Sequence, residues 1–247
     1  MQLRVASITD RGLNPSRTHN EDSFFTGNQL YIVADGLGGE LAGEVANQMT
    51  IEKFNEWFPD ATRESANEAG SELAAIERTV KRVNAYVYQE AQKPEFKNMG
   101  STLSILYFFR NHALIGHVGD SKIYRVRKGK TEQLSHDQSM VQQLLDKGII
   151  TTEQAKRHPM RNVLLSCIAH KPDIDVFTYD TDIQNGDFYL LCSDGVSEYV
   201  GHGAIAEMAG NGFSGEEICA TIKNIVYAGG AMDNMTAIVI FVDQVDA

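Results

Sequence analysis

Four aspartates stand where an apolar stretch of the chain meets a glycine or an asparagine. They are Asp35 in Ala-Asp-Gly, Asp120 in Gly-Asp-Ser, Asp194 in Ser-Asp-Gly and Asp233 in Asp-Asn-Met-Thr. Apolar, partly β-branched runs favour buried strands, so each carboxylate is expected at a strand end. Carboxylates and free backbone carbonyls are the ligands that Mg²⁺ and Mn²⁺ prefer. The pattern predicts that, if the strand ends converge, the four carboxylates share one pocket with divalent cations.

Charge repulsion decides what such a pocket needs. Two carboxylates ~4 Å apart repel by about 4 kcal/mol at an effective dielectric constant of about 20. A cluster of four would therefore need bound cations to stay ionised. A single Asp-Gly pair has a simpler explanation, because it is a common hairpin turn. The recurrence of the pattern in separate segments is what favours a metal site.

The elements that would carry these residues are mostly strands, with helices between groups of them. Consecutive antiparallel strands are expected at 102–109, 113–118 and 122–126, and such a meander argues against a parallel doubly wound sheet. Gly27-Asn28 is a hairpin signal between strands at 24–26 and 29–34. Further strands are expected at 131–134, 174–179, 188–192 and 237–242.

Helices are expected from their apolar spacing and their capping residues. Apolar residues three and four apart predict a helix over about 66–92 whose buried face is Leu73, Ile76, Val80, Val83 and Val87. Capping-box sequences predict helix starts at Thr151 and Ser214. Two more helices are expected, one after Gly39 to about residue 58 and one over 138–147.

Composition narrows the class of function. The chain has 247 residues and a formal net charge of −11, which argues against nonspecific binding to nucleic acid or to anionic membranes. The three cysteines, Cys167, Cys192 and Cys219, form no Cys-x-x-Cys motif, which favours a reducing compartment without disulfides. The first residues do not resemble a signal peptide, and no apolar stretch approaches ~18 residues. We expect a cytoplasmic monomer that binds neither nucleic acid nor membrane.

Six short motifs follow one another along the chain. They are Arg17-Thr-His-Asn-Glu-Asp22, Ala34-Asp-Gly-Leu-Gly-Gly39, Gly100-Ser-Thr102, Val118-Gly-Asp-Ser121, Leu191-Cys-Ser-Asp-Gly195 and Asp233-Asn-Met-Thr236. In this order they resemble the PP2C-type (PPM family) metal-dependent protein serine/threonine phosphatases, and most of all the compact bacterial type. The resemblance implies an α+β fold, a four-layer α-β-β-α sandwich with two central antiparallel sheets flanked by helices. It also implies a single catalytic domain over residues 1–247 with a mobile flap at about 140–172.

The resemblance assigns metal-binding roles to five residues. Asp35 would bridge two Mn²⁺ or Mg²⁺ ions, with the Gly36 carbonyl on one of them. Asp194 and Asp233 would complete the other, and Asp120 with Asp194 resembles the ligands of a third, weaker site. A water bridging two ions would attack the phosphorus directly, without a covalent phosphoenzyme.

The resemblance gives the polar neighbours supporting roles. Arg17 would bind the substrate phosphate with its bidentate fork. Glu21 and Asp22 would hold metal-bound waters. Asn234 would orient Asp233 or cap a turn. The general acid stays unassigned, because Leu37 stands where some family members carry a histidine. His19 or a metal-bound water could supply the proton, although a solvated loop histidine is the simpler interpretation of His19.

The implied function is removal of phosphate from phosphoserine and phosphothreonine in proteins, opposing a bacterial eukaryotic-like serine/threonine kinase and its targets. A function of another class is a catalytically silent PP2C-like domain that binds phosphoproteins or scaffolds a complex. Silent copies should lose ligands, and this chain keeps all four aspartates and Arg17. A third possibility is a narrower role on one regulatory or secretion-system protein, which changes the partner and not the chemistry.

Overall fold

The computed structural model describes residues 1–38, 41–64 and 70–245, and its strands form two antiparallel sheets. The five-stranded sheet has the order β1 (Gln2–Asp10), β11 (Met235–Gln244), β10 (Phe188–Cys192), β7 (Lys122–Arg127) and β8 (Lys130–Gln133). The six-stranded sheet has the order β2 (Asp22–Gly27), β3 (Leu30–Leu37), β5 (Leu103–Phe109), β6 (His112–Val118) and β9 (Phe177–Asp182), with β4 (Gly100–Ser101) paired to β3.

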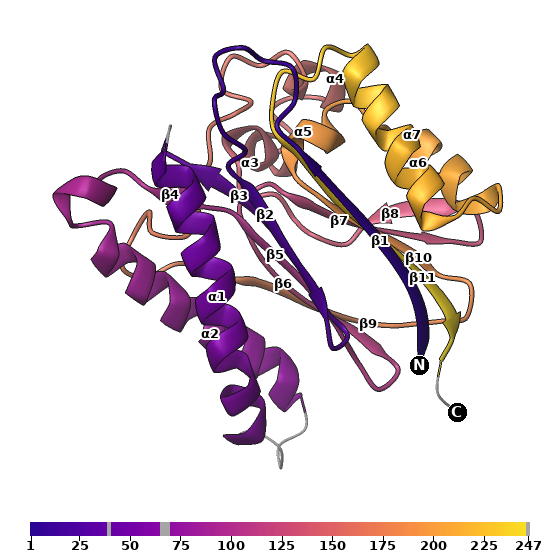
Figure 1. The fold of residues 1–247 in the computed structure, drawn as a ribbon, viewed down its shortest axis with the longest axis horizontal. Helices are drawn as coiled ribbons and strands as arrows, with labels where there is room; N and C mark the ends of the chain where they lie inside the picture. The colour runs from indigo at the N-terminus through magenta and orange to yellow at the C-terminus, as the bar shows by residue number, and fades with distance from the viewer. Residues whose placement is uncertain (39–40, 65–69, 246–247) are drawn as a thin grey trace.

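Helices cover the outer face of each sheet (Figure 1). Two of them, α1 (Leu41–Glu64) and α2 (Ser71–Glu90), pack on the six-stranded sheet. On the five-stranded sheet lie α5 (Asp194–Ser197), α6 (His202–Gly210) and α7 (Gly215–Ala228). Apolar side chains from both sheets, such as Val33 and Leu191, fill the space between them. The predicted four-layer sandwich is confirmed.

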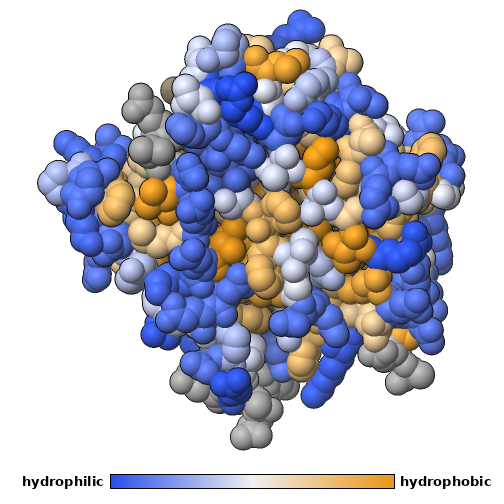
Figure 2. Space-filling model, viewed as in Figure 1, coloured by the Kyte–Doolittle hydropathy of each residue, from blue (hydrophilic) through white to orange (hydrophobic). Residues whose placement is uncertain are grey.

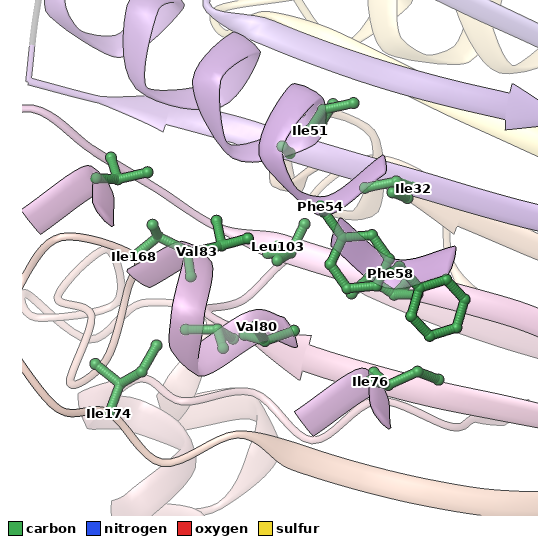
Figure 3. Packing of buried hydrophobic residues seen from close by; sticks show 14 of the residues in the cluster. Ile32, Ile51, Phe54, Phe58, Ile76, Val80, Val83, Leu103, Ile168 and Ile174 are labelled. Carbon is green, nitrogen blue, oxygen red and sulfur yellow. The ribbon is translucent and has the colours of Figure 1, made fainter. Parts of the chain in front are cut away.

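The predicted apolar face of α2 faces the core. Its residues Ile76, Val80 and Val83 are fully buried, and Figure 3 shows them close to Leu103 of β5 and to the phenylalanines of α1. The predicted end of the preceding helix was wrong, because α1 continues through Pro59 to Glu64. Proline inside a helix removes one hydrogen bond and its ring crowds the carbonyl four residues earlier, at a cost of about 3 kcal/mol. Packing before it, where the Phe54 and Phe58 rings stack 5.0 Å apart, offsets that loss.

The predicted meander is wrong at one point, and that point carries Asp120. Strands β5 and β6 pair, but β7 lies in the other sheet beside β10. The chain crosses between the sheets at Gly119, whose φ of +109° is open mainly to glycine. The crossing places Asp120 where the two sheets meet.

The end of β3 also differs from the prediction. The strand does not stop before Asp35 but continues to Leu37, because Gly36 and Leu37 pair with Ser101 and Gly100 of β4. The turn comes at Gly38, with φ of +126°; Gly39 lies outside the described residues. The hairpin before β3 turns at Asn28 and Gln29, which both have positive φ, one residue later than predicted.

The segment predicted as a flap, residues 140–172, contains two short helices. They are α3 (Met140–Asp146) and α4 (Thr152–Ala155), and the capping box at Thr151 is confirmed, as is the one at Ser214 before α7. The 3-10 turn η1 (Pro94–Phe96) follows α2. Strand β9 starts at Phe177 and not at residue 174. Helices α5 and α6 had no counterpart in the prediction.

The surface seen in Figure 2 is polar at its margins, where the helices lie, and apolar residues gather between them over β1 and β2. None of the described helices is long and apolar enough to cross a membrane.

Candidate metal-dependent active site

One pocket of about 420 Å³ lies where the ends of β3, β6 and β10 and the start of β11 meet. It collects residues from segments far apart in sequence: Arg17, Glu21, Asp35, Gly36, Asp120, Asp194 and Asp233. His19 also lines it, so it remains within reach of a bound substrate. Asp22 and Asn234 are not lining residues; both are buried. The predicted convergence of the four aspartates therefore occurs.

Asp35 is fixed at the end of β3 by Thr102. The Asp35 N–H donates to Thr102 Oγ1 at 2.9 Å, and the Thr102 N–H donates to the Asp35 carbonyl at 2.8 Å. The Thr102 hydroxyl also lies 2.8 Å from that of Ser121, next to Asp120. One buried threonine thus ties two of the acidic segments together. It lies in the predicted Gly-Ser-Thr motif, but sequence reasoning gave it no role.

Position 36 has space only for glycine. A Cβ there would lie 2.3 Å from the Gly43 carbonyl oxygen and 2.7 Å from that of Glu21. The first turn of α1 therefore packs directly on the strand end. Asn47 of the same helix donates to the Glu21 carbonyl, and its own side-chain oxygen accepts from Ser23 at 3.0 Å. These contacts hold the Glu21 segment against Asp35.

Asp194 and Asp233 are brought together by an equally close contact. A Cβ on Gly195, in the first turn of α5, would lie 1.9 Å from the Asn234 carbonyl oxygen and 3.3 Å from Asp233 Cβ. Only glycine lets α5 approach this loop. The side chain of Asn234 fixes the loop further, donating to the Arg11 and His19 carbonyls at 2.9 and 3.3 Å and accepting from the Glu21 N–H at 2.9 Å.

The substitution Gly195→Ala should therefore separate Asp194 from Asp233. A backbone clash of this kind typically costs about 1–3 kcal/mol, or roughly 2–4 °C in Tm per kcal/mol for a chain of this size. The matched control is Gly203→Ala in α6, where an added Cβ meets nothing within 4 Å. Thermal melts of both variants check this, and equal Tm values for the two would contradict it.

Asp22 links the two sheets beneath the pocket. Ser193 donates to Asp22 Oδ2 at 2.7 Å, and the Ser193 hydroxyl accepts from the Thr236 N–H at 3.0 Å. In the β2–β3 pairing Asp22 stands opposite Asp35. Its other oxygen, Oδ1, has no hydrogen-bond partner in the part of the chain that the structure describes. The predicted role in holding a metal-bound water stays a prediction, and the sheet-to-sheet contact is a role that the sequence did not reveal.

Arg17 lies inside the pocket but binds protein groups there. Its Nη2 is 2.6 Å from Asp233 Oδ2, and its Nη1 is 3.6 Å from Glu21 Oε2 and 3.4 Å from Asn234 Oδ1. The guanidinium predicted to bind phosphate is thus held by a carboxylate that is predicted to bind metal. A cation on Asp233 would release Arg17 toward the pocket.

Burial and mutual repulsion dominate the electrostatics. Burial, then the charges of Asp22 and Asp194, raise the pKa of Asp35 well above its usual value. Burial, then Asp194, raises the pKa of Asp120 to about 7. Burial also raises the pKa of Asp22 to about 7, against the hydrogen bond from Ser193. The pKa values of Asp194 and Asp233 are raised for the same leading reason.

The donor set fits a hard cation. Three buried carboxylate oxygens, Glu21 Oε1, Asp22 Oδ1 and Asp194 Oδ1, have no hydrogen-bond partner among the described residues, a costly condition that a cation would relieve. Within the described ranges, no three His, Cys, Asp or Glu side chains are gathered closely enough to hold one ion. The ion pair between Arg17 and Asp233 explains why the ligands are not gathered more closely, because it occupies the Asp233 carboxylate. The oxygens are assembled, and ligation requires local rotation of side chains.

Comparison with known proteins decides the family. The family model described as protein phosphatase 2C matches residues 15–220. The chain belongs to the protein phosphatase 2C family. It is 34% identical over 238 residues to the serine/threonine protein phosphatase PstP of Mycobacterium tuberculosis, covering 96% of this chain and 44% of PstP. The chain thus spans less than half of that relative's length.

A second relative matches over its full length, and a solved structure of the PstP catalytic domain matches almost completely. The protein phosphatase PhpP of Streptococcus pneumoniae is 28% identical over 250 residues, which cover 99% of this chain and 100% of PhpP. The crystal structure of the catalytic domain of PstP in complex with two manganese ions has a TM-score of 0.84 and 32% identity. That comparison covers 98% of this chain and 99% of the PstP chain.

Proposed function

We propose that the protein is a metal-dependent protein serine/threonine phosphatase that hydrolyses phosphoserine and phosphothreonine in proteins. The observation that carries the proposal is the convergence of four aspartates and Arg17, from separate segments, on one pocket. Membership of the protein phosphatase 2C family supports it. A silent phosphoprotein-binding domain would have no need for this set of unsatisfied carboxylate oxygens.

We assign the Mn²⁺ or Mg²⁺ ligands as Asp35, the Gly36 carbonyl, Asp194 and Asp233, with Asp120 and Asp194 at a third site. The PstP catalytic domain with two manganese ions supports two ions here. When bound, such ions supply an activated water and stabilise developing charge on phosphate oxygens. The remaining work belongs to the chain: Thr102 and Gly195 position the carboxylates, and Glu21 and Asp22 offer unpaired oxygens to ordered water.

The cellular setting is part of the proposal. The substrates would be the targets of a cognate serine/threonine kinase, in the cytoplasm, and the protein would act as a monomer without nucleic acid or membrane. Residues 1–247 would form one catalytic domain, with residues 140–172 as its flap.

Hydrolysis of a phosphothreonine peptide by the purified protein tests the function. Turnover is expected with Mn²⁺ or Mg²⁺ and should stop with EDTA. A folded protein that releases no phosphate with either ion would overturn the proposal and favour the silent phosphoprotein-binding domain.

The role of Arg17 is tested by Arg17→Lys, which keeps the charge and removes the bidentate fork. Charge-assisted hydrogen bonds contribute about 1.5–3 kcal/mol, so kcat/KM should fall by about 10–100-fold. Arg63→Lys is the matched control, because Arg63 is exposed on α1 and pairs there with Asp60, far from the pocket lining. Unchanged kcat and KM in Arg17→Lys would remove Arg17 from phosphate binding.

A further inference from the structure

A second cavity of about 490 Å³, here called the flap chamber, adjoins the candidate active site. Its walls come from α3 and α4 on one side and from β7, α5 and the start of α6 on the other. Asp120, Asn162 and Asp194 line both the chamber and the pocket. A peptide whose phosphate lies in the pocket could therefore place a neighbouring side chain in the chamber. The volume lies within the range of about 300–1,000 Å³ typical of ligand sites.

The outer wall of the chamber includes an apolar helix face that the protein covers only in part. Val141 and Leu145 of α3 are four residues apart and so share one face of that helix. Both line the chamber, and none of the residues of α3 is buried. The opposite wall contributes Tyr124 and Val200, which are buried. Apolar helix faces in globular proteins normally pack against the core, whereas this half-buried face borders the chamber.

The charges around the chamber select what could fill that space. Lys122 and Asp137 neutralise each other in an ion pair at its wall. At the end shared with the pocket stand Asp120 and Asp194, which would repel an acidic side chain. Arg161 also lines the chamber, and its Nε is 3.9 Å from Glu198 Oε1. Lys156 lines the chamber too, and it pairs with Glu153 at 2.8 Å. Because these charges are paired, an uncharged, apolar group is the best match to the chamber.

We infer that the flap chamber is a specificity subsite for an apolar side chain next to the phosphorylated residue of a protein substrate. The inference rests on the proposed phosphatase function. It predicts that the enzyme distinguishes phosphopeptides by a leucine-sized residue at one flanking position and rejects glutamate there.

The test uses phosphothreonine peptides that carry alanine, leucine or glutamate at one flanking position at a time, with p-nitrophenyl phosphate as a substrate too small to reach the chamber. At one position leucine should raise kcat/KM over alanine by about tenfold or more, as expected for added methylenes in an apolar pocket. Glutamate at that position should lower it. In Val141→Asp the leucine preference should disappear while hydrolysis of p-nitrophenyl phosphate stays as in the unchanged protein.

Ile149→Asp is the matched control, because Ile149 is 62% exposed just beyond α3 and does not line the chamber. It should keep the preference. If Val141→Asp lowers p-nitrophenyl phosphate turnover through misfolding, Val141→Thr, similar in shape, should still weaken the preference. Turnover of all peptides without preference at any position overturns the subsite and leaves the phosphatase function standing. Equal loss in the Val141 and Ile149 variants also overturns it. Absence of turnover of every substrate overturns the proposed function, and the subsite with it.

Discussion

Asp194→Asn should remove metal-dependent phosphatase turnover and, at the same time, make the metal-free protein more resistant to heat. The proposed ligand loses its charge. Loss of a single oxyanion-hole donor already costs on the order of 10²–10³ in kcat, and we expect loss of a charged metal ligand to cost at least as much. In the unchanged protein, the Asp194 carboxylate lies close to other carboxylates. Its negative charge helps to raise the pKa of Asp35 and of Asp120. An amide of the same shape relieves that repulsion and can donate to the Asp35 carboxylate beside it.

The measurement pairs peptide hydrolysis with thermal melts in chelator. Asp60→Asn, on the exposed surface of α1, is the control and should change neither quantity. Turnover that survives in Asp194→Asn would remove this residue from the proposed ligand set. A fall in Tm for the metal-free variant would show that the carboxylate is stabilised by its surroundings, contrary to the electrostatics described above. The opposite signs of the two effects separate a functional loss from general damage to the fold.

The sequence predicted the site better than it predicted the local paths of the chain. Each of the four aspartates was expected at a strand end. Asp120, Asp194 and Asp233 each lie two residues beyond a strand end, whereas Asp35 lies inside β3, two residues before its last residue. The apolar runs beside them are buried between the sheets or under a helix. It was harder to predict which of the two sheets each strand joins. The runs of β6 and β7 have the same apolar pattern whether they pair with each other or not, and only the bend at Gly119 separates them.

The features that could not be predicted from the sequence depend on contacts between segments far apart in the chain. Thr102 and Ser193 are ordinary polar residues in sequence. The role of Thr102 arises from its bonds to Asp35 within the six-stranded sheet, and that of Ser193 from its bond to Asp22 across the two sheets. Gly195 was read as part of a motif, but the reason for glycine is the Asn234 carbonyl 39 positions later in the chain. The Arg17–Asp233 ion pair could not be predicted from the sequence either, because the charge of an arginine does not determine which carboxylate it binds.

The stability of the metal-free protein should fall as pH rises from about 5 to 7, and Mn²⁺ should reduce that fall. Asp22 and Asp120 each have a pKa raised from 3.8 to about 7. The folded state therefore binds more protons than the unfolded state between these values, so stability decreases with rising pH. Each pKa unit corresponds to about 1.4 kcal/mol. A bound cation favours the ionised carboxylates and so offsets the loss.

One buried histidine, His117, has the opposite effect on how stability changes with pH. Burial lowers the pKa of His117 from 6.5 to about 4, and its ring is held by Ser104 and the Gly119 carbonyl. The unfolded state binds the extra proton in this case, so His117 alone makes stability rise with pH over the same interval. The pKa values of Asp22 and Asp120 are shifted further than that of His117, and the pKa of Asp35 is raised as well. The carboxyl groups therefore outweigh the histidine, and stability should decrease as pH rises.

Thermal melts in chelator at several pH values, repeated with saturating Mn²⁺, measure the slope directly. A decrease of at least about 5 °C in Tm from pH 5 to 7 is expected without metal, since 1 kcal/mol corresponds to about 2–4 °C in a chain of this size. Asp22→Asn should flatten the metal-free curve, because it removes one of the titrating groups and keeps an acceptor for Ser193. A metal-free Tm that rises over this interval would mean that the carboxylates are already neutralised by the protein. The pocket would then have no electrostatic need for a cation, and the argument for a metal centre would have to rest on the family alone.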